Sequence, residues 1–186
     1  HHPTIKFNDE VFRLWSRVMA AVPNARLLMF RNQLGGEALE LLRSKLQQFQ
    51  FPLDRVDLRC PTEHPQDYLK LYHEIDVILD TFPFNSHTMT CEALWMGCPT
   101  VTLYGDRPTS RLSSSVLMQL GLPQFIGHSS DQFVSICERL AQDPTPLESI
   151  RAGLREKMRS LIGDGATFTR QFEDILRQMW RRWAKG

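Results

Sequence analysis

Short apolar runs alternate with helical patterns along this chain as far as residue 126. Each run has the length of a strand, and the helical patterns between them are about 8 to 15 residues long. Such alternation predicts βαβ units, in which a helix joins two parallel strands and covers one face of the sheet. The expected strands are Leu27–Phe30, Val56–Leu58, Ile75–Leu79 and Val101–Leu103, with a further short run at Phe125 and Ile126.

The expected helices carry apolar residues at helical spacing. Asn8 is a candidate cap for the first of them, and the acidic residues Asp9 and Glu10 suit the positive end of that helix. No linker, repeat or low-complexity segment divides the chain. We therefore expect one α/β domain over residues 1–186, a Rossmann-like parallel sheet with flanking helices and a helical C-terminal tail. The expected helices are 8–23, 35–49, 65–72, 88–96, 110–120, 130–141, 147–161 and 168–183.

The charge balance limits the partners of the chain. It has 22 Lys and Arg against 21 Asp and Glu, a formal net charge of +1. Binding to nucleic acids or to anionic membranes requires a clear basic excess, so we expect neither as a partner. No apolar run approaches the roughly 20 residues that span a bilayer, and the N-terminus has no secretory pattern. We expect a soluble, cytoplasmic protein.

The cysteines do not suggest a metal site. None of them forms a C-x-x-C pair, and those in apolar surroundings are typical of small buried hydrophobic residues in a reducing compartment. Cys60 and His64 are four residues apart, but no second tight pair follows to complete a tetrahedral zinc site. We therefore expect no metal. The four cysteines are Cys60, Cys91, Cys98 and Cys137.

A polar loop separates the expected strand Ile75–Leu79 from the next helix. In doubly wound sheets, ligands bind outside the carboxyl ends of the strands, where this loop should lie. Ser86, His87 and Thr88 stand at the start of the helix, where free backbone N–H groups favour an anion such as a phosphate. Glu92 lies about one turn further along the same face and is placed to accept hydrogen bonds from a ribose diol.

Each of these features also has a purely structural interpretation. The sequence Asn-Ser-His-Thr is a good capping sequence, which by itself would account for the loop. Glu92 is equally typical of a solvated surface carboxylate, and His87 of a structural histidine. Trp95 and Met96 are expected to pack in the core.

The stretch FNSHTMTCEALWMGCPTVTLYGDRPTSRLSSSVLMQLGLPQFI, residues 84–126, resembles the C-terminal catalytic lobe of glycosyltransferase family 41. That family holds the O-linked N-acetylglucosamine transferases, the SPINDLY-type O-fucosyltransferases and many bacterial proteins with tetratricopeptide repeats. Further similarity lies at Lys6, in VPNARLLMF at residues 22–30 and in the terminal LRQMWRRW, so the resemblance covers essentially the whole chain.

The resemblance implies a role for several residues. Lys6 matches the family lysine that neutralises the diphosphate of the nucleotide sugar, and is the expected catalytic residue. His87 and Thr88 match the pair at the diphosphate, and Glu92 matches the acidic residue that holds the ribose. Lys6 and the helix end would then replace the divalent cation that other glycosyltransferases use, so the resemblance implies no metal and no cofactor.

The resemblance also identifies residues expected to bind the nucleobase, and at two positions this chain departs from the family pattern. Thr62 and Glu63 match the loop against the nucleobase, and Tyr68 replaces a base-stacking histidine with another aromatic ring. Met89 stands where the family has a second threonine, so one hydroxyl donor is lost. Arg111 matches an S-R position that is expected to brace the lobe.

The resemblance implies the nucleotide-sugar-binding half of a GT-B fold enzyme that transfers a sugar with inversion onto Ser or Thr of a protein acceptor. UDP-N-acetylglucosamine is the first expected donor, and GDP-fucose is the alternative. An N-terminal lobe and tetratricopeptide repeats are expected upstream, and the isolated lobe is expected to bind nucleotide weakly and to be inactive.

Two other classes of function stay open at this point. A degenerate, non-catalytic interaction module would account for the departures at Met89 and Tyr68. A dinucleotide-dependent oxidoreductase is disfavoured because no G-x-G-x-x-G follows an expected strand.

Overall fold

The computed structural model describes residues 6–30, 35–59 and 65–186 and is an α/β fold in which every strand pair is parallel. β1 (Leu27–Phe30) pairs with β2 (Val56–Arg59), with Leu27 opposite Val56. β3 (Ile78–Leu79), β4 (Thr100–Leu103) and β5 (Ile126–Gly127) form a second sheet in that order. The parallel α/β class is confirmed. The single continuous sheet is not found among these strands, because β1 and β3 are not hydrogen-bonded to each other.

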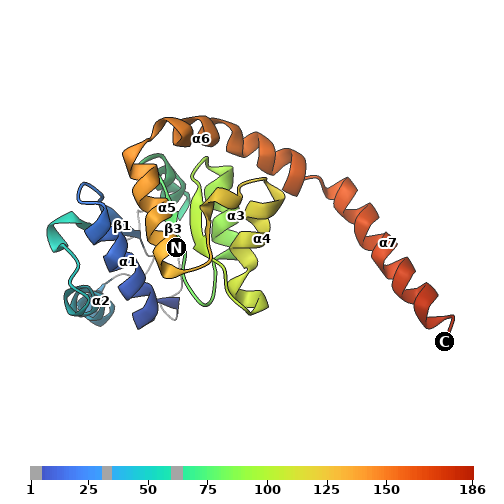
Figure 1. Ribbon diagram of the computed structural model, residues 1–186, viewed down its shortest axis with the longest axis horizontal. Helices are drawn as coiled ribbons and strands as arrows, with labels where there is room; N and C mark the ends of the chain where they lie inside the picture. Colours follow the sequence, from blue (N-terminus) through green and yellow to red (C-terminus); the bar gives the residue numbers. More distant parts are fainter. Residues whose placement is uncertain (1–5, 31–34, 60–64) are drawn as a thin grey trace.

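The helices match most of the expected ranges (Figure 1). The expected helix 65–72 is instead a 3₁₀ segment, η3 (Pro65–His73), and α6 ends in a π-helical turn, Met158–Ile162. Shorter 3₁₀ turns lie at Leu53–Arg55, Pro108–Ser110 and Pro123–Phe125. The α-helices are α1 (Asp9–Ala21), α2 (Gly36–Gln48), α3 (His87–Trp95), α4 (Leu112–Gln119), α5 (Ser130–Gln142), α6 (Thr145–Lys157) and α7 (Gly165–Trp183).

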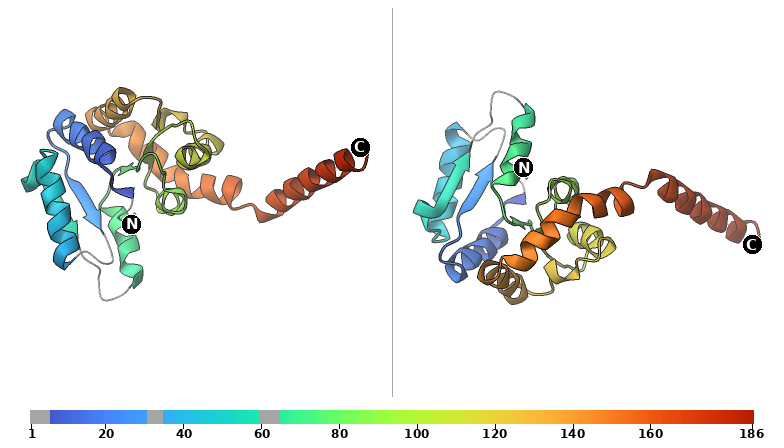
Figure 2. Two further views of the ribbon diagram at one scale, coloured as in Figure 1. Left: turned by 90° about the horizontal axis from the view of Figure 1, so that it is seen from below. Right: turned by 90° about the horizontal axis from the view of Figure 1, so that it is seen from above.

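Helix α1 packs against both sheets and joins them in one hydrophobic core. The Asn8 side chain caps it by accepting a hydrogen bond from the Val11 N–H at 2.9 Å, as the sequence predicts. Its apolar residues, including Phe12 and Trp15, are buried in a cluster with side chains of β1, β4 and α5. Figure 2 shows the half that contains β1 and α2 beside the half that contains α3 and α4.

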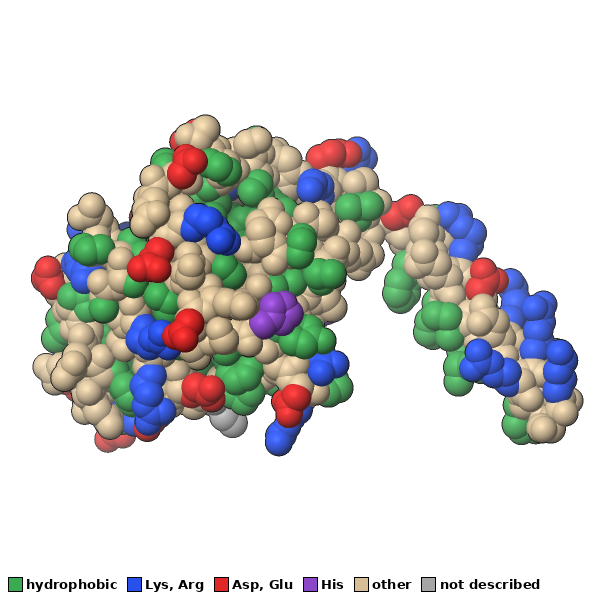
Figure 3. Space-filling view, in the orientation of Figure 1, with side chains coloured by type: hydrophobic (Ala, Val, Ile, Leu, Met, Phe, Trp, Pro, Cys, Tyr) green, Lys and Arg blue, Asp and Glu red, His purple; other side chains and the backbone are tan. Residues whose placement is uncertain are grey.

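The last helix stands apart from this core. α7 has no buried residue and projects away from the body (Figure 1). Apolar side chains line one side of it and arginines the other (Figure 3). Its apolar residues are Phe168, Phe172, Ile175, Leu176, Met179, Trp180 and Trp183. No helix in the three described stretches is both long and apolar enough to cross a membrane.

Trp95 corrects one expectation about the core. Its side chain is 42% exposed at the end of α3. The Arg155 guanidinium lies 5.7 Å from the ring centroid, and Arg155 Nε donates to the Trp95 carbonyl at 3.0 Å. The indole therefore packs under a cation at the surface.

Two buried thiols predict how stability depends on pH. Burial raises the pKa of both Cys98 and Cys137 to about 12, against about 8.5 in an unfolded chain. The folded state therefore keeps these protons while the unfolded state loses them, so stability falls as pH rises above the unfolded value. From about pH 7.5 to 9.5, we expect the free energy of unfolding to fall by about 3 kcal/mol through these groups.

Urea denaturation under reducing conditions across this pH range measures the effect. The double variant Cys98→Ala, Cys137→Ala should have a flatter profile, whatever its absolute stability. Parallel profiles for the two proteins would show that the thiols contribute nothing to the pH dependence.

Candidate functional site

A buried carboxylate organises the loop between β3 and α3. Asp80 is 2% exposed, and its Oδ1 accepts from the backbone N–H groups of Thr81 at 2.8 Å and Ser86 at 3.0 Å. Its Oδ2 accepts from Thr102 Oγ1 at 2.7 Å. The nearby Ser113 hydroxyl, which is also hydrogen-bonded to Thr90 Oγ1 at 2.8 Å, favours the charged form of the carboxylate. Burial raises the pKa of Asp80, and these donors act in the opposite direction by favouring the charged form.

Further hydrogen bonds close the loop on itself. Thr81 Oγ1 donates to the Phe84 carbonyl at 2.8 Å, and Asn85 Nδ2 donates to the Thr81 carbonyl at 2.9 Å. The Asn85 N–H donates to the Thr109 carbonyl at 3.0 Å, which ties the loop to the segment after β4. The start of α3 is therefore held in place by the protein itself.

The first turn of α3 offers backbone donors to solvent. Among the groups that the structure describes, none accepts a hydrogen bond from the N–H of His87, Thr88 or Met89. His87 and Thr88 are exposed, and Ser86 makes no side-chain capping bond to the helix. An explanation of this loop by capping alone is thus not supported, and the free amides with the helix dipole favour an anion here.

Lys6 lies against the same loop. Its Nζ donates to the Asn85 carbonyl at 2.8 Å, across 79 residues of chain, and lies 4.0 Å from the centroid of the Phe84 ring. Partial burial lowers the pKa of Lys6, and the charge of Asp80 counteracts that effect. The structure therefore brings Lys6 to the loop that leads into His87 and Thr88.

Glu92 is held by two tyrosines. Tyr68 OH donates to Glu92 Oε2 and Tyr72 OH to Glu92 Oε1, both at 2.8 Å. The Tyr68 ring also stacks on Phe30, with the ring centroids 6.2 Å apart and the planes 10° from parallel. Hydrogen bonding to Glu92 is the main cause that raises the pKa of Tyr68, and burial is the main cause for Tyr72. Glu92 is therefore an oriented carboxylate.

Tyr72, like Asp80, is a site residue that the sequence did not identify. It is 6% exposed, as an apolar aromatic residue of the core would be. Its position four residues after Tyr68 was the available signal, because two phenols on one segment can reach the same acceptor. Thr62 and Glu63, the predicted nucleobase contacts, lie outside the described residues, as do Cys60 and His64.

Arg111 takes the bracing position that the sequence predicts. Its Nε donates to the Gly105 carbonyl at 2.7 Å and its Nη2 to the Asp106 carbonyl at 3.0 Å. The guanidinium also lies 4.9 Å from the centroid of the Tyr104 ring. These contacts fix the turn after β4. Within the described ranges, no group of three His, Cys, Asp or Glu side chains is placed to hold a metal ion.

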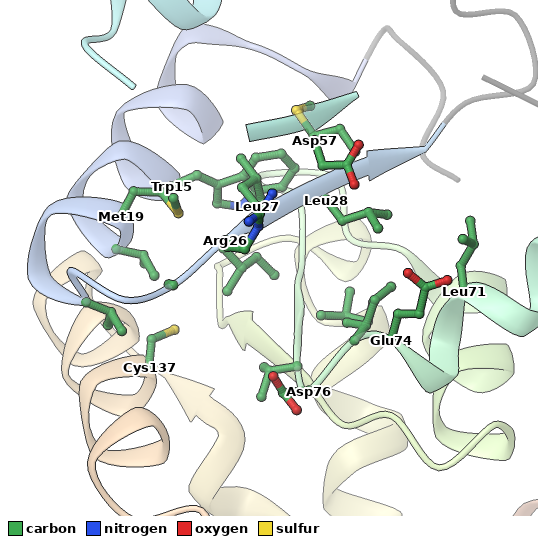
Figure 4. Close-up of a pocket in the computed structure, with 18 of the residues that line it drawn as sticks. Trp15, Met19, Arg26, Leu27, Leu28, Asp57, Leu71, Glu74, Asp76 and Cys137 are labelled. Atoms are coloured by element: carbon green, nitrogen blue, oxygen red, sulfur yellow. The ribbon is translucent and has the colours of Figure 1, made fainter. Parts of the chain in front are cut away.

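A cavity of about 750 Å³ borders the tyrosine pair (Figure 4). β1 and β3 contribute consecutive residues to its wall, and Tyr68, Tyr72 and Met89 also line it. Leu27 and Leu28 of β1 point into the space that Leu71, Glu74 and Asp76 border from another side (Figure 4). The crevice between the two sheets therefore reaches the residues around Glu92.

Comparisons with known proteins agree on one family. The family model for glycosyl transferase family 41 matches residues 4–171. The probable UDP-N-acetylglucosamine–peptide N-acetylglucosaminyltransferase SPINDLY of Petunia hybrida is 36% identical over 183 residues, which are 97% of this chain and 20% of that protein. The UDP-N-acetylglucosamine–peptide N-acetylglucosaminyltransferase of Caenorhabditis elegans is 28% identical over 182 residues, 97% of this chain and 16% of that protein.

A solved structure is similar over nearly the same range. A mutant of the O-GlcNAc transferase of Thermobaculum terrenum superposes with a TM-score of 0.84 and 35% identity, over 93% of this chain and 34% of that chain. The present chain thus spans about a fifth of the length of the SPINDLY relative and about a third of the solved one.

Proposed function

This chain belongs to glycosyl transferase family 41, and from that premise we propose that it is the nucleotide-sugar-binding lobe of an inverting protein O-glycosyltransferase. The observation that carries the proposal is the approach of Lys6 Nζ to the loop before α3, 2.8 Å from the Asn85 carbonyl. A cation and three free backbone N–H groups then face one region. A pyrophosphate is a ligand that suits such donors.

The donor sugar nucleotide would lie along α3. Its diphosphate would accept hydrogen bonds from the N–H groups at His87, Thr88 and Met89, and its ribose hydroxyls would donate to Glu92. Each carboxylate oxygen of Glu92 accepts one tyrosine hydroxyl, which leaves lone pairs for a diol. The base would lie toward Tyr68 and the predicted loop at Thr62 and Glu63.

The chemistry follows from this placement. The hydroxyl oxygen of an acceptor Ser or Thr attacks the anomeric carbon from the face opposite the diphosphate, and the bond from that carbon to the diphosphate oxygen breaks. The proton of the attacking hydroxyl passes to the departing diphosphate or to water. The bonding electrons stay with the leaving nucleotide, so negative charge grows on its terminal phosphate. The Lys6 ammonium would stabilise that charge more in the transition state than in the bound donor. Lys6 and the helix end supply positive charge at the diphosphate without a metal.

UDP-N-acetylglucosamine is the proposed donor, because the Petunia and Caenorhabditis relatives are named for it. GDP-fucose is the second candidate donor. The acceptor would be supplied with the help of an upstream lobe and tetratricopeptide repeats of the full-length protein, and the isolated lobe would transfer little or no sugar. The protein is proposed to act in the cytoplasm.

Transfer and binding assays on the full-length protein test this proposal. We expect transfer from UDP-N-acetylglucosamine in a panel of nucleotide sugars, and saturable heats of binding for UDP in calorimetry. A preference for GDP and GDP-fucose would change the donor and keep the reaction class. No binding of UDP or GDP at millimolar concentration would favour a non-catalytic interaction module and overturn the proposal.

Glu92→Gln tests the ribose contact. The amide keeps the shape of the side chain but replaces one acceptor oxygen with a donor, so we expect UDP to bind roughly 10-fold more weakly. Glu148→Gln, on the exposed first turn of α6, is the matched control and should bind UDP normally. Calorimetry with UDP and 2′-deoxy-UDP adds a specific readout, because the variant should lose the preference for UDP. If wild type and variant bound UDP with equal affinity, Glu92 would be a surface carboxylate that does not contact the ribose.

A further inference from the structure

Both carboxylate oxygens of Glu92 are held by hydrogen bonds. Tyr72 OH donates to Oε1 and Tyr68 OH to Oε2, each at 2.8 Å. A single donor would fix one oxygen and leave the plane of the carboxylate free to turn, because the last torsion angle of a glutamate side chain is broad. Donors on both oxygens fix the plane as well. The direction of the Glu92 carboxylate is therefore set before a ligand binds.

The two tyrosines differ in how firmly their rings are held. Tyr72 is 6% exposed and belongs to a small buried cluster with Cys98 and Ala93, the residue after Glu92. Tyr68 is half-buried and packs against the outside of that cluster. The position of the Tyr72 hydroxyl thus follows from the packing of its ring, and its burial leaves little room for a water molecule to replace it. Tyr72 is the firmer of the two supports.

The segment that carries Tyr72 is anchored to the fold without the help of Glu92. Just after η3, the carbonyls of Ile75 and Asp76 accept hydrogen bonds from Arg151 Nη1 of α6 at 2.7 and 2.8 Å. This anchor and the packing on Ala93 hold the Tyr72 ring against α3. The phenol can therefore orient the carboxylate, because its own place does not depend on it.

A ribose diol needs an acceptor of this kind. Its 2′- and 3′-hydroxyls are neighbours, so the two oxygens of one carboxylate can accept from both at once. Glu92 offers both oxygens in this way only while the plane of its carboxylate is fixed. Each oxygen accepts one tyrosine hydroxyl and has a further lone pair for the ligand.

We propose that Tyr72 is a positioning residue for nucleoside recognition, which orients Glu92 and so gives the site its preference for ribose over 2′-deoxyribose. Tyr68 is the second, weaker support. The inference rests on the proposed function, because it requires the ribose to lie at Glu92. It assigns Tyr72 no contact with the nucleotide. Loss of the Tyr72 hydroxyl should therefore weaken the ribose contact and leave the diphosphate contact at α3 unchanged.

Tyr72→Phe in the full-length protein tests this role, since it keeps the buried ring and removes the donor. Calorimetry with UDP and 2′-deoxy-UDP, or with the guanine pair if the wild type prefers GDP, measures the preference. We expect UDP to bind about 5-fold more weakly and the preference for UDP to shrink. Tyr68→Phe should shrink it by a smaller factor. Tyr104→Phe is the matched control, on a ring 39% exposed after β4, and should bind both nucleotides normally.

A double-mutant cycle provides a readout that a purely structural role would not change. If Tyr72 acts through Glu92, Tyr72→Phe should alter the affinity for UDP by less than about twofold in a Glu92→Gln background. Equal losses in the two backgrounds would overturn the positioning role, because Tyr72 would then affect binding by another route. Near-UV circular dichroism checks that each variant keeps its packed core.

The outcomes separate this inference from the proposed function. If Glu92→Gln abolishes the preference for UDP over 2′-deoxy-UDP while Tyr72→Phe and Tyr68→Phe retain it in full, the tyrosines have no positioning role and the proposed function stands. If the wild type binds neither UDP nor GDP, the proposed function and the role of Tyr72 are both wrong.

Discussion

Lys6→Ala in the full-length protein is expected to lower the turnover number by about 100- to 1,000-fold, or roughly 3 kcal/mol of transition-state stabilisation. The ammonium lies at the loop before α3, where charge would develop on the departing diphosphate. Because this interaction strengthens in the transition state, the Michaelis constant for the donor should change much less than the turnover number. Steady-state kinetics with the preferred nucleotide sugar measure both constants.

Two further variants separate charge from packing. Lys6→Arg keeps a cation and should retain part of the activity. Lys45→Ala removes an ion pair with Asp9, 2.8 Å long, on the outer side of α1, and should leave the turnover number unchanged. A turnover number within about twofold of wild type for Lys6→Ala would exclude Lys6 from the chemistry.

Asp80→Ala is expected to cost about 3 to 5 kcal/mol of the free energy of unfolding. The change leaves the N–H groups of Thr81 and Ser86 buried without an acceptor, together with the hydroxyl of Thr102. Each orphaned buried donor costs roughly 1 to 3 kcal/mol, less where a hydroxyl can turn to another partner. Urea denaturation measures the loss.

Matched variants sharpen this result. Asp80→Asn retains one acceptor oxygen and should lose about half as much stability as the alanine variant. Asp76→Ala removes an exposed carboxylate just before β3 and should change the free energy of unfolding by less than about 0.5 kcal/mol. If Asp80→Ala were no more destabilising than Asp76→Ala, the carboxylate would not organise the loop.

The sequence predicted where the helices and strands lie better than it predicted which other elements they pack against or pair with. The spacing of apolar residues and the cap at Asn8 located α1, and the same spacing located α7. Whether a helix face is covered depends on the rest of the molecule, so the exposure of α7 could not be read from its pattern. The break between β1 and β3 is likewise a property of pairing over distance.

In the candidate site, too, local features were predictable from the sequence and contacts between distant residues were not. The loop at His87 and Thr88 was predictable because a strand end and a helix start adjoin in the sequence. Asp80 resembled an ordinary turn residue, since its burial depends on Thr102 and other distant donors. The contact from Tyr72 to Glu92 spans 20 residues and two elements, so the spacing of Tyr68 and Tyr72 could suggest a shared acceptor but could not identify Glu92 as that acceptor.

The four tryptophans of the chain lie in contrasting surroundings. Trp15 is 3% exposed, whereas Trp95, Trp180 and Trp183 are 42%, 64% and 80% exposed. The Trp15 indole N–H donates to the Asp80 carbonyl at 3.3 Å. A soluble quencher such as acrylamide therefore suppresses the fluorescence of the outer three and spares Trp15. The chain thus carries an intrinsic optical reporter at the junction of α1 with the Asp80 loop.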